Sequence, residues 1–284
     1  MQGRPRSGRV LAAVAAILLV AASAAFAPRL WSGGPRFGGW NRLPPKFATA
    51  SDFDGSWTYC RGFYTSSYRE PGGSGWNTDY PGADNNFSVR LMELTTVHVP
   101  VDEHRQPNYV VVALSDPVLF KCPILFMEDV GTAEFSEEEV RNLRNFFLKG
   151  GFLWADDYWG REAWDNWAEQ IGRVLPGGEF PIFDIPLTHP VMHTLYDVKD
   201  FLQVPSLNFW YGNSGSTSER GSESAQVHFR GIQDRRQRLM VMMTHNTDIA
   251  DTWEREVDSP EYFDLFSPRG YAIGVNVLLY ALTH

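Results

Sequence analysis

The sequence predicts an α/β fold in which helices cover both faces of a mostly parallel sheet. The segment from Phe146 to Gly160 has the pattern of a helix end, a glycine stop, a short apolar strand and the two carboxylates Asp156 and Asp157. Apolar runs of strand length between turn residues are typical of buried parallel strands. Strand patterns also alternate with helical patterns along much of the chain, which favours parallel crossover connections.

The N-terminus has the layout of an export segment. Three arginines within the first nine residues precede an uncharged apolar run over residues 10–27. We expect residues 1–27 to be a cleaved signal peptide or a retained membrane anchor, and the sequence leaves both open. Either outcome places the rest of the chain in the periplasm or cell envelope. Residues 28–50 then read as a Gly/Pro-rich tether, and residues 51–284 as a single α/β domain.

Charge and cysteine content narrow the function classes. The formal net charge is −9 and the isoelectric point is near 5.3, which argues against nucleic acid as a partner because that role needs a basic face. Cys60 and Cys122 would be free to pair in an oxidising compartment, but we expect two buried, unpaired thiols. The chain carries neither a phosphate-binding glycine loop nor a metal-binding cysteine cluster. We therefore expect no cofactor and no metal.

The first half of the domain contains most of the predicted regular structure. Alternating or apolar patterns predict strands over residues 57–64, 97–101, 109–114 and 124–127. Three helices are predicted, over residues 84–94 with Asp84 as N-cap, from the capping box Ser136–Glu139 to Gly150, and over residues 162–175. A 19-residue loop containing Trp76 and Asp79 precedes the first helix.

The second half is less regular. We expect a short strand over 180–185, a capped turn over 188–193 and an exposed Gly/Ser-rich loop over 212–224. The runs 227–232 and 238–244 read as paired strands, and Ser267-Pro268 is predicted to begin a final apolar helix that ends at Leu282. The Gly/Ser-rich loop is either a lid or a mobile connection.

Polar clusters follow the apolar strands and define the candidate site. These clusters are Asp116, Glu128-Asp129, Asp156-Asp157, and His245 with Asp248. Parallel strands would gather them along one edge of the sheet, where ligands bind in open α/β folds. Crowded carboxylates there would act in acid/base chemistry or bind cations. The alternative is that each aspartate caps the element that follows it. Because successive strand residues face opposite ways, at most one of Asp156 and Asp157 should face the crevice.

Catalytic roles are expected for Asp156, Asp157 and His245, with a neighbouring carboxylate orienting the imidazole for proton transfer. The alternative is that His245 bonds backbone in a tight turn. His189 and His193 have the spacing of two metal ligands, but Pro190 and the lack of an intervening glutamate argue against a zinc site. Ligand-binding roles are expected for a further set: Asp79, Trp76, Asp129, Trp159, His189 and Asp248. The tryptophans would stack on sugars or, alternatively, pack in the core and at its rim.

These residues include a recognisable signature. The stretch from Trp57 to His284, with Trp76-x-Thr-Asp-Tyr-Pro81, Lys149-Gly-Gly-Phe-Leu-Trp-Ala-Asp-Asp157, His189-Pro190 and His193-Thr-Leu-Tyr196, resembles a bacterial family known as domain of unknown function 4159. That family is similar to the class I glutamine amidotransferase-like superfamily, which includes trehalose-utilisation-like proteins. The resemblance implies a flavodoxin-like three-layer α/β/α sandwich.

The resemblance implies a scaffold more than an activity. Relatives carry a nucleophilic cysteine at the turn where this chain has Asp156-Asp157, whereas the position of their histidine matches His245. Without a thiolate no acyl-enzyme forms. We therefore expect an exported or membrane-anchored binding module of the cell envelope that recognises a polar ligand or an envelope protein. The alternatives are a carboxylate/histidine hydrolase acting on carbohydrate or peptide, and a structural module whose crevice is filled by aromatic side chains.

Overall fold

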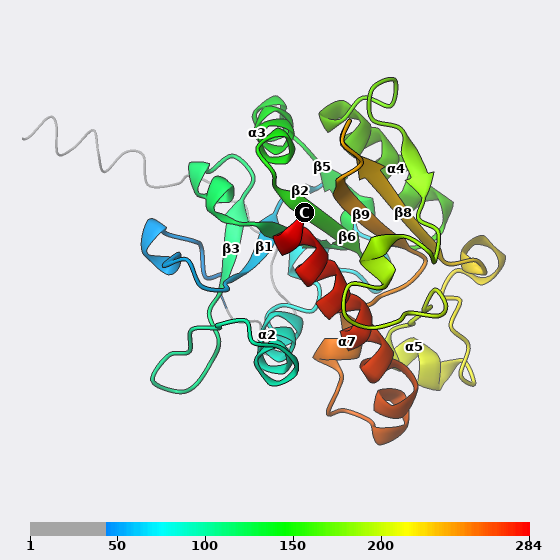
Figure 1. Cartoon of the computed structure of the whole chain (residues 1–284). Helices are drawn as coiled ribbons and strands as arrows, with labels where there is room; N and C mark the ends of the chain where they lie inside the picture. Colours follow the sequence, from blue (N-terminus) through cyan, green and yellow to red (C-terminus); the bar gives the residue numbers. More distant parts are fainter. Residues whose placement is uncertain (1–43) are drawn as a thin grey trace, which may run out of the picture. The chain divides into compact units, whose positions relative to one another are not determined.

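A seven-stranded sheet forms the centre of the domain in the computed structural model, which describes residues 44–284 (Figure 1). The expected export segment and most of the tether lie outside the described residues. The strand order is β3-β1-β4-β6-β9-β8-β7. The bounds are β1 Tyr59–Phe63, β3 Tyr109–Ala113, β4 Ile124–Glu128, β6 Phe152–Asp156, β7 Ile182–Asp184, β8 His228–Gln233 and β9 Leu239–His245. Strands β3, β1, β4, β6 and β9 are parallel, and β8 is antiparallel to both of its neighbours. The prediction of a mostly parallel sheet in an α/β fold is confirmed.

Helices cover both faces of this sheet and create two separate cores. Helices α3 (Glu137–Leu148) and α4 (Gly160–Val174) pack on one face, and α2 (Gly82–Leu94) and α7 (Pro260–Thr283) pack on the other. The short helices α5 (Leu207–Gly212) and α6 (Asp251–Glu254) lie on the α7 side. Successive residues of a strand point alternately into the two cores. In β6, Trp154 points to the α7 side and Leu153 to the α3 side.

Local sequence signals set the bounds of α3. Ser136 Oγ accepts a hydrogen bond from the amide of Glu139, whose carboxylate in turn accepts one from the amide of Ser136. This reciprocal arrangement is the predicted capping box. After the helix, Gly150 takes a φ of 106°, a conformation that L-residues with a side chain rarely adopt. The chain can therefore turn directly from α3 into β6.

Three predictions of secondary structure need correction. Helix α2 begins at Gly82, so Asp84 is not its N-cap but a buried side chain inside its first turn. Helix α7 begins at Pro260 with Ser259 as its cap, and Pro268 lies inside it. Residues 97–101 form no strand and contribute only one isolated bridge, Val101 to Pro107. In each case tertiary packing outweighed the local signal.

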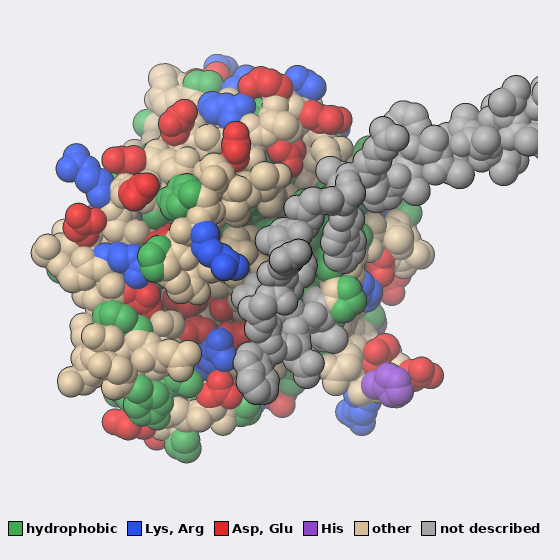
Figure 2. All heavy atoms as spheres, turned by 180° about the vertical axis from the view of Figure 1, so that it is seen from behind, with side chains coloured by type: hydrophobic (Ala, Val, Ile, Leu, Met, Phe, Trp, Pro, Cys, Tyr) green, Lys and Arg blue, Asp and Glu red, His purple; other side chains and the backbone are tan. Residues whose placement is uncertain are grey.

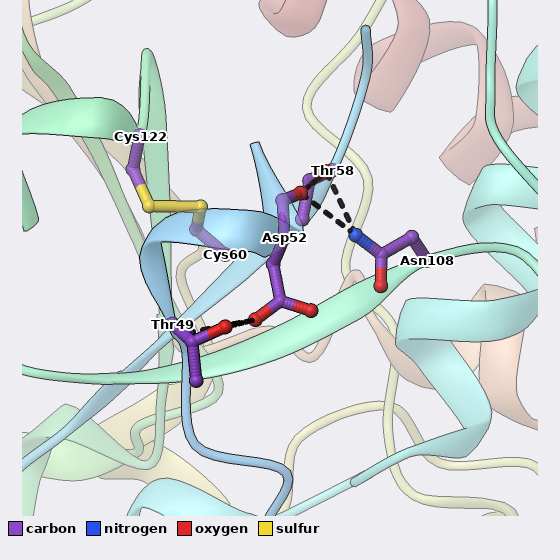
Figure 3. The surroundings of a disulfide bond; sticks show 6 residues. All are labelled: Thr49, Asp52, Thr58, Cys60, Asn108 and Cys122. Carbon is purple, nitrogen blue, oxygen red and sulfur yellow. Dashed lines mark hydrogen bonds between the residues drawn. A yellow bond between two sulfur atoms is a disulfide. The ribbon is translucent and has the colours of Figure 1, made fainter. Parts of the chain in front are cut away.

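The two cysteines form a disulfide, which corrects the expectation of unpaired thiols (Figure 3). Cys60 lies in β1, and Cys122 lies just before β4, at the end of the 3-10 helix η4 (Pro117–Lys121). The Cα atoms are 6.1 Å apart, which is within normal disulfide range. The 62-residue sequence separation concealed this proximity. It arises because η4 returns the chain from the edge strand β3 to a position beside β1.

Within residues 44–284, no helix has both the length and the apolar character needed to cross a membrane.

Candidate functional site

The carboxyl ends of three neighbouring parallel strands share one backbone feature. Strands β4, β6 and β9 are each followed at once by an Asp or Asn in the left-handed region: Asp129 with φ 51°, Asp157 with φ 52° and Asn246 with φ 63°. Short polar side chains tolerate this conformation better than other L-residues do. The amide of Asp129 donates to the carbonyl of Asp156, and the amide of Asn246 donates to that of Tyr158. The three turns are thereby held next to one another at one edge of the sheet.

Three carboxylates converge at this edge. Asp79, Asp248 and Asp251 each present an oxygen, and these oxygens lie within 4.8 Å of one another. Asp79 comes from the loop before α2, where its φ is 60°, Asp248 comes from the turn between β9 and α6, and Asp251 is the first residue of α6. The amide of Asp251 donates to Asp248 Oδ1 at 2.9 Å, which fixes the spacing of this pair. We call Asp79, Asp248 and Asp251 the acidic triad.

Further buried carboxylates interact electrostatically with the acidic triad or with one another. They are Glu70, Glu128, Asp129, Asp156 and Asp157. The guanidinium groups near them are few: Arg255 contacts Asp251, Arg220 contacts Glu70, and Arg61 lies 4.0 Å from Glu128. Buried charges need partners, because removing an ion from water costs several kcal/mol. Negative charge at this edge therefore exceeds the positive charge available among the described residues.

Four carboxylate oxygens in this region have no hydrogen-bond partner among the described residues. They are Glu70 Oε2, Asp79 Oδ2, Glu128 Oε2 and Glu254 Oε2, and all four atoms are shielded from solvent. Glu128 is only 1% exposed and interacts electrostatically with Asp156 and Asp251. A buried polar atom without a partner is costly in free energy. Such carboxylate oxygens can be stabilised by a proton or by a cation.

Arg61 lies beside this region and has no exposed surface. Its Nε and Nη2 atoms donate to Asp84, with the shortest contact at 2.6 Å, and Nη1 donates to the carbonyl of Thr78 at 2.9 Å. The charge of Asp84 holds the pKa of Arg61 above its ordinary value despite burial. Arg61 therefore neutralises Asp84 and fixes the loop that carries Asp79. It is not free to neutralise the acidic triad.

Asp156 and Asp157 have different surroundings. Asp156 accepts from Thr244 Oγ1 at 2.5 Å and from the amide of Ala250 at 3.0 Å, so both of its oxygens are bonded. Within residues 44–284, Asp157 accepts a side-chain hydrogen bond only from Trp159 Nε1, at 2.9 Å, and it interacts electrostatically with Asp129. Asp156 thus holds the turn before α6 in place. Both members of the pair interact electrostatically with other carboxylates, Asp156 with Glu128 and Asp157 with Asp129.

His245 lies on the α4 side of the sheet, away from Asp156. Thr244, its neighbour in β9, bonds to Asp156, and successive strand residues face opposite ways. The ring of His245 stacks on Tyr158, and its Nε2 bonds to the carbonyl of Gly160 at 2.9 Å. Burial, reinforced by the nearby charge of Arg230, lowers its pKa to about 4, so it is neutral at physiological pH. The predicted carboxylate–imidazole pair is not assembled, and the backbone-bonded alternative describes this residue.

Other residues with predicted roles lie in varied places. Trp159 is buried beside Asp157, whereas the Trp76 ring packs on Phe63 with centroids 5.2 Å apart. His189 caps a 3-10 turn and contacts Gln233, at the end of the sheet opposite the acidic triad, so the structure does not bring it to the site. Asp116 is exposed and caps η4 through the amide of Val118.

Burial controls the protonation of the acidic groups. It raises the pKa of Asp129 to about 8 and that of Asp156 to about 7, and neighbouring carboxylates such as Glu70 add to the effect on Asp129. Burial likewise raises the pKa values of Asp79 and Asp248, with further increases from carboxylates around them. Without a bound cation the site would retain protons at neutral pH.

The raised pKa of Asp129 predicts a pH dependence of stability in the metal-free protein. Its folded-state pKa of about 8 exceeds the unfolded value of about 4, so the folded form binds more protons between those limits. The free energy of unfolding should therefore fall as pH rises from 5 to 8, and Asp129→Asn should flatten this slope. Urea denaturation at several pH values, in the presence of a chelator, measures this slope. Asp116→Asn, at an exposed cap, is the matched control, and an unchanged slope in Asp129→Asn would contradict the prediction.

Sequence reasoning missed Asp251 and Arg61. Asp251 stands three residues after Asp248, at the start of α6, and was not among the polar residues considered after the strands. Arg61 had a usable signal, because a charged residue inside an aromatic strand must find a buried partner. The identity of that partner, 23 positions along the chain, was not visible.

Comparison with known proteins gives one match to a family. The model of the family described as "Domain of unknown function (DUF4159)" matches residues 65–282. This range includes every member of the acidic triad. No curated protein matches the chain.

Proposed function

The chain belongs to the DUF4159 family, and we propose that it is a binding module of the cell envelope whose acidic triad holds a divalent cation. One observation carries this proposal: oxygens of Asp79, Asp248 and Asp251 lie within 4.8 Å of one another in a buried region with an excess of carboxylates. Two unit negative charges at that distance repel by about 3 kcal/mol at an effective dielectric constant of about 20. A divalent cation would convert this repulsion into attraction.

The chemistry of the ligands favours a hard cation, and we take Ca²⁺ as the candidate. Calcium binds six to eight oxygen ligands at about 2.4 Å in irregular arrangements, which suits carboxylates that come from a loop, a turn and the start of a helix. All three donors are carboxylates, the ligands that hard cations prefer. The neighbouring unpartnered oxygen of Glu128 supplies a further acceptor close to the triad.

Burial restricts the size of the ligand. Asp248 and Asp251 are almost wholly buried, and only Asp79 is partly exposed. This suits an ion better than a larger molecule. Acidic side chains also gather in a hollow near the middle of the face in Figure 2. A bound ion would join the loop before α2 to the turn before α6, so it would order the edge of the sheet that faces a polar ligand or an envelope partner.

We also propose a flavodoxin-like scaffold and an exported location, and a separate observation supports each of them. The five parallel strands follow the order 2-1-3-4-5 in chain sequence, which is the flavodoxin-like order, and this supports a glutamine amidotransferase-like scaffold that lacks the cysteine. The Cys60–Cys122 disulfide supports an exported location, since such bonds persist in oxidising compartments. We do not propose the hydrolase, because His245 and Asp156 face opposite sides of the sheet.

Calcium titration of the purified protein tests the proposed function. After treatment with a chelator, Ca²⁺ at about 100 times its dissociation constant should stabilise the fold by about 2.7 kcal/mol, which raises the melting temperature by about 5–10 °C at this chain length. Asp248→Asn should abolish the increase, because it removes one of the three carboxylate ligands.

Asp165→Asn, on the exposed surface of α4, is the matched control and should respond to calcium like the parent protein. Isothermal titration calorimetry with Ca²⁺ and Mg²⁺ gives the affinity directly. An equal calcium response in Asp248→Asn and the parent protein would overturn the proposal, as would the absence of a response in the parent protein.

A further inference from the structure

Arg255, just after α6, makes the one ion pair that the structure describes, within residues 44–284, between the acidic triad and a basic side chain. Its Nε atom lies 3.3 Å from Asp251 Oδ1. The same guanidinium interacts electrostatically with Asp79. Because the charges are opposite, Arg255 partly neutralises the acidic triad in the metal-free protein.

Glu254 is a fourth carboxylate beside the acidic triad. Among charged groups, it has the strongest electrostatic interaction with both Asp79 and Asp251. Its side chain lies against the backbone at the start of α2, where a Cβ added to Gly82 would be 2.7 Å from Glu254 Cγ. Glu254 Oε2 is shielded from solvent and lies 2.7 Å from Arg255 Nη2, although this contact lacks the geometry of a hydrogen bond. Glu254 is therefore held between the acidic triad and Arg255.

Arg255 is held less firmly than Arg61. The side chain of Arg255 is 38% exposed, and its contacts with Asp251 and Asp258 are long, at 3.3 and 3.4 Å. Arg61, in contrast, has no exposed surface and is joined to Asp84 at 2.6 Å. A guanidinium that already reaches solvent recovers hydration when its ion pair breaks, so such pairs contribute little stability. Arg255 can therefore leave the acidic triad at small cost.

We propose that Arg255 is an internal counter-ion that a divalent cation displaces from the acidic triad, and that Glu254 then becomes a fourth carboxylate ligand. This inference rests on the proposed function, because it describes how the same site is filled. A divalent ion carries twice the charge of a guanidinium and concentrates it on one atom, so it attracts carboxylate oxygens more strongly. A fourth carboxylate also brings the protein ligands closer to the six to eight oxygens that calcium takes.

Calorimetric titration of the full chain with Ca²⁺, after treatment with a chelator, tests the displacement. Arg255→Met removes the competing charge and keeps a long unbranched side chain, so the affinity for calcium should increase about tenfold. Arg255→Lys retains the charge and should bind calcium about as tightly as the parent protein does. Arg269→Met, which removes the exposed ion pair with Asp200 on the surface of α7, is the matched control and should keep the parent affinity.

Glu254→Gln tests the fourth ligand in the same titration. This substitution should weaken calcium binding about tenfold or more, because an amide oxygen carries no net charge to offer the ion. Glu261→Gln, which removes an exposed carboxylate in the first turn of α7, is the matched control for the loss of one negative charge. It should change the affinity by less than about twofold, since charges at the surface are screened.

The outcomes separate this inference from the proposed function. Failure of the parent protein and of Arg255→Met to bind calcium would overturn both. Calcium binding by the parent protein, with equal or lower affinity in Arg255→Met, would leave the cation site in place and overturn the internal counter-ion. An equal gain in Arg255→Met and Arg255→Lys would also overturn it, because the charge would then not be the cause. Unchanged affinity in Glu254→Gln would overturn the fourth ligand.

Discussion

Replacing Arg61 by methionine is expected to lower the free energy of unfolding by about 3–5 kcal/mol, the usual cost of removing one partner from a buried ion pair. Arg61 and Asp84 have fully buried side chains and are joined at 2.6 Å. The substitution keeps much of the volume but leaves Asp84 charged and unpaired. It also removes the only guanidinium within 4 Å of Glu128 among the described ion pairs. Urea denaturation at pH 7 measures the loss.

Two further variants test whether the loss of the ion pair explains that result. Arg161→Met removes an exposed ion pair with Asp165 and should change stability by less than about 1 kcal/mol. Asp84→Asn added to Arg61→Met should recover part of the loss, because the pair is coupled and the amide removes the unpaired charge. A decrease in the free energy of unfolding below about 1 kcal/mol in Arg61→Met, or no recovery in the double variant, would show that the Arg61–Asp84 pair does not hold the loop that carries Asp79.

Loss of the Cys60–Cys122 disulfide is expected to cost about 4 kcal/mol. The bond closes a loop with a sequence separation of 62 residues, and the chain-entropy account of cross-links gives this magnitude for such a loop. Both cysteines are buried, so reduction should require partial unfolding or a denaturant. Urea denaturation with and without a phosphine reductant measures the difference.

The double variant Cys60→Ala/Cys122→Ala is the control for that measurement. It should resemble the reduced parent protein in stability and should not respond to the reductant. Equal stability of the oxidised and reduced parent proteins would mean that packing around β1 and η4 holds this region without the bond. Non-reducing mass analysis of the purified protein would confirm that the bond forms.

Much of the fold was predictable because its signals are local. The apolar run of β6, the Ser136 capping box and Gly150 each act within a few residues. The β8–β9 pairing was also predictable, because the two strands are close in the sequence. The start of α7 was missed because Ser259-Pro260 and Ser267-Pro268 offer the same start signal. The packing of Tyr262 and Phe266 in the core favours the earlier start.

The candidate site was only partly predictable for a geometric reason. The sequence placed Asp129, Asp157 and Asp248 at one edge of the sheet, since residues after parallel strands share an edge. It did not distinguish the two faces of that edge. The face depends on strand register, which puts Thr244 beside Asp156 and turns His245 toward α4.

The sequence by itself determined the α/β class, the parallel strands and the row of acids at their carboxyl ends, because hydrophobic periodicity and turn residues act over short distances. Only the tertiary structure decided which acids meet. Asp79 joins Asp248 and Asp251 from about 170 positions away, and Cys60 joins Cys122 in the same long-range manner. Such contacts depend on how crossovers return the chain to the sheet, and no local pattern encodes that distance.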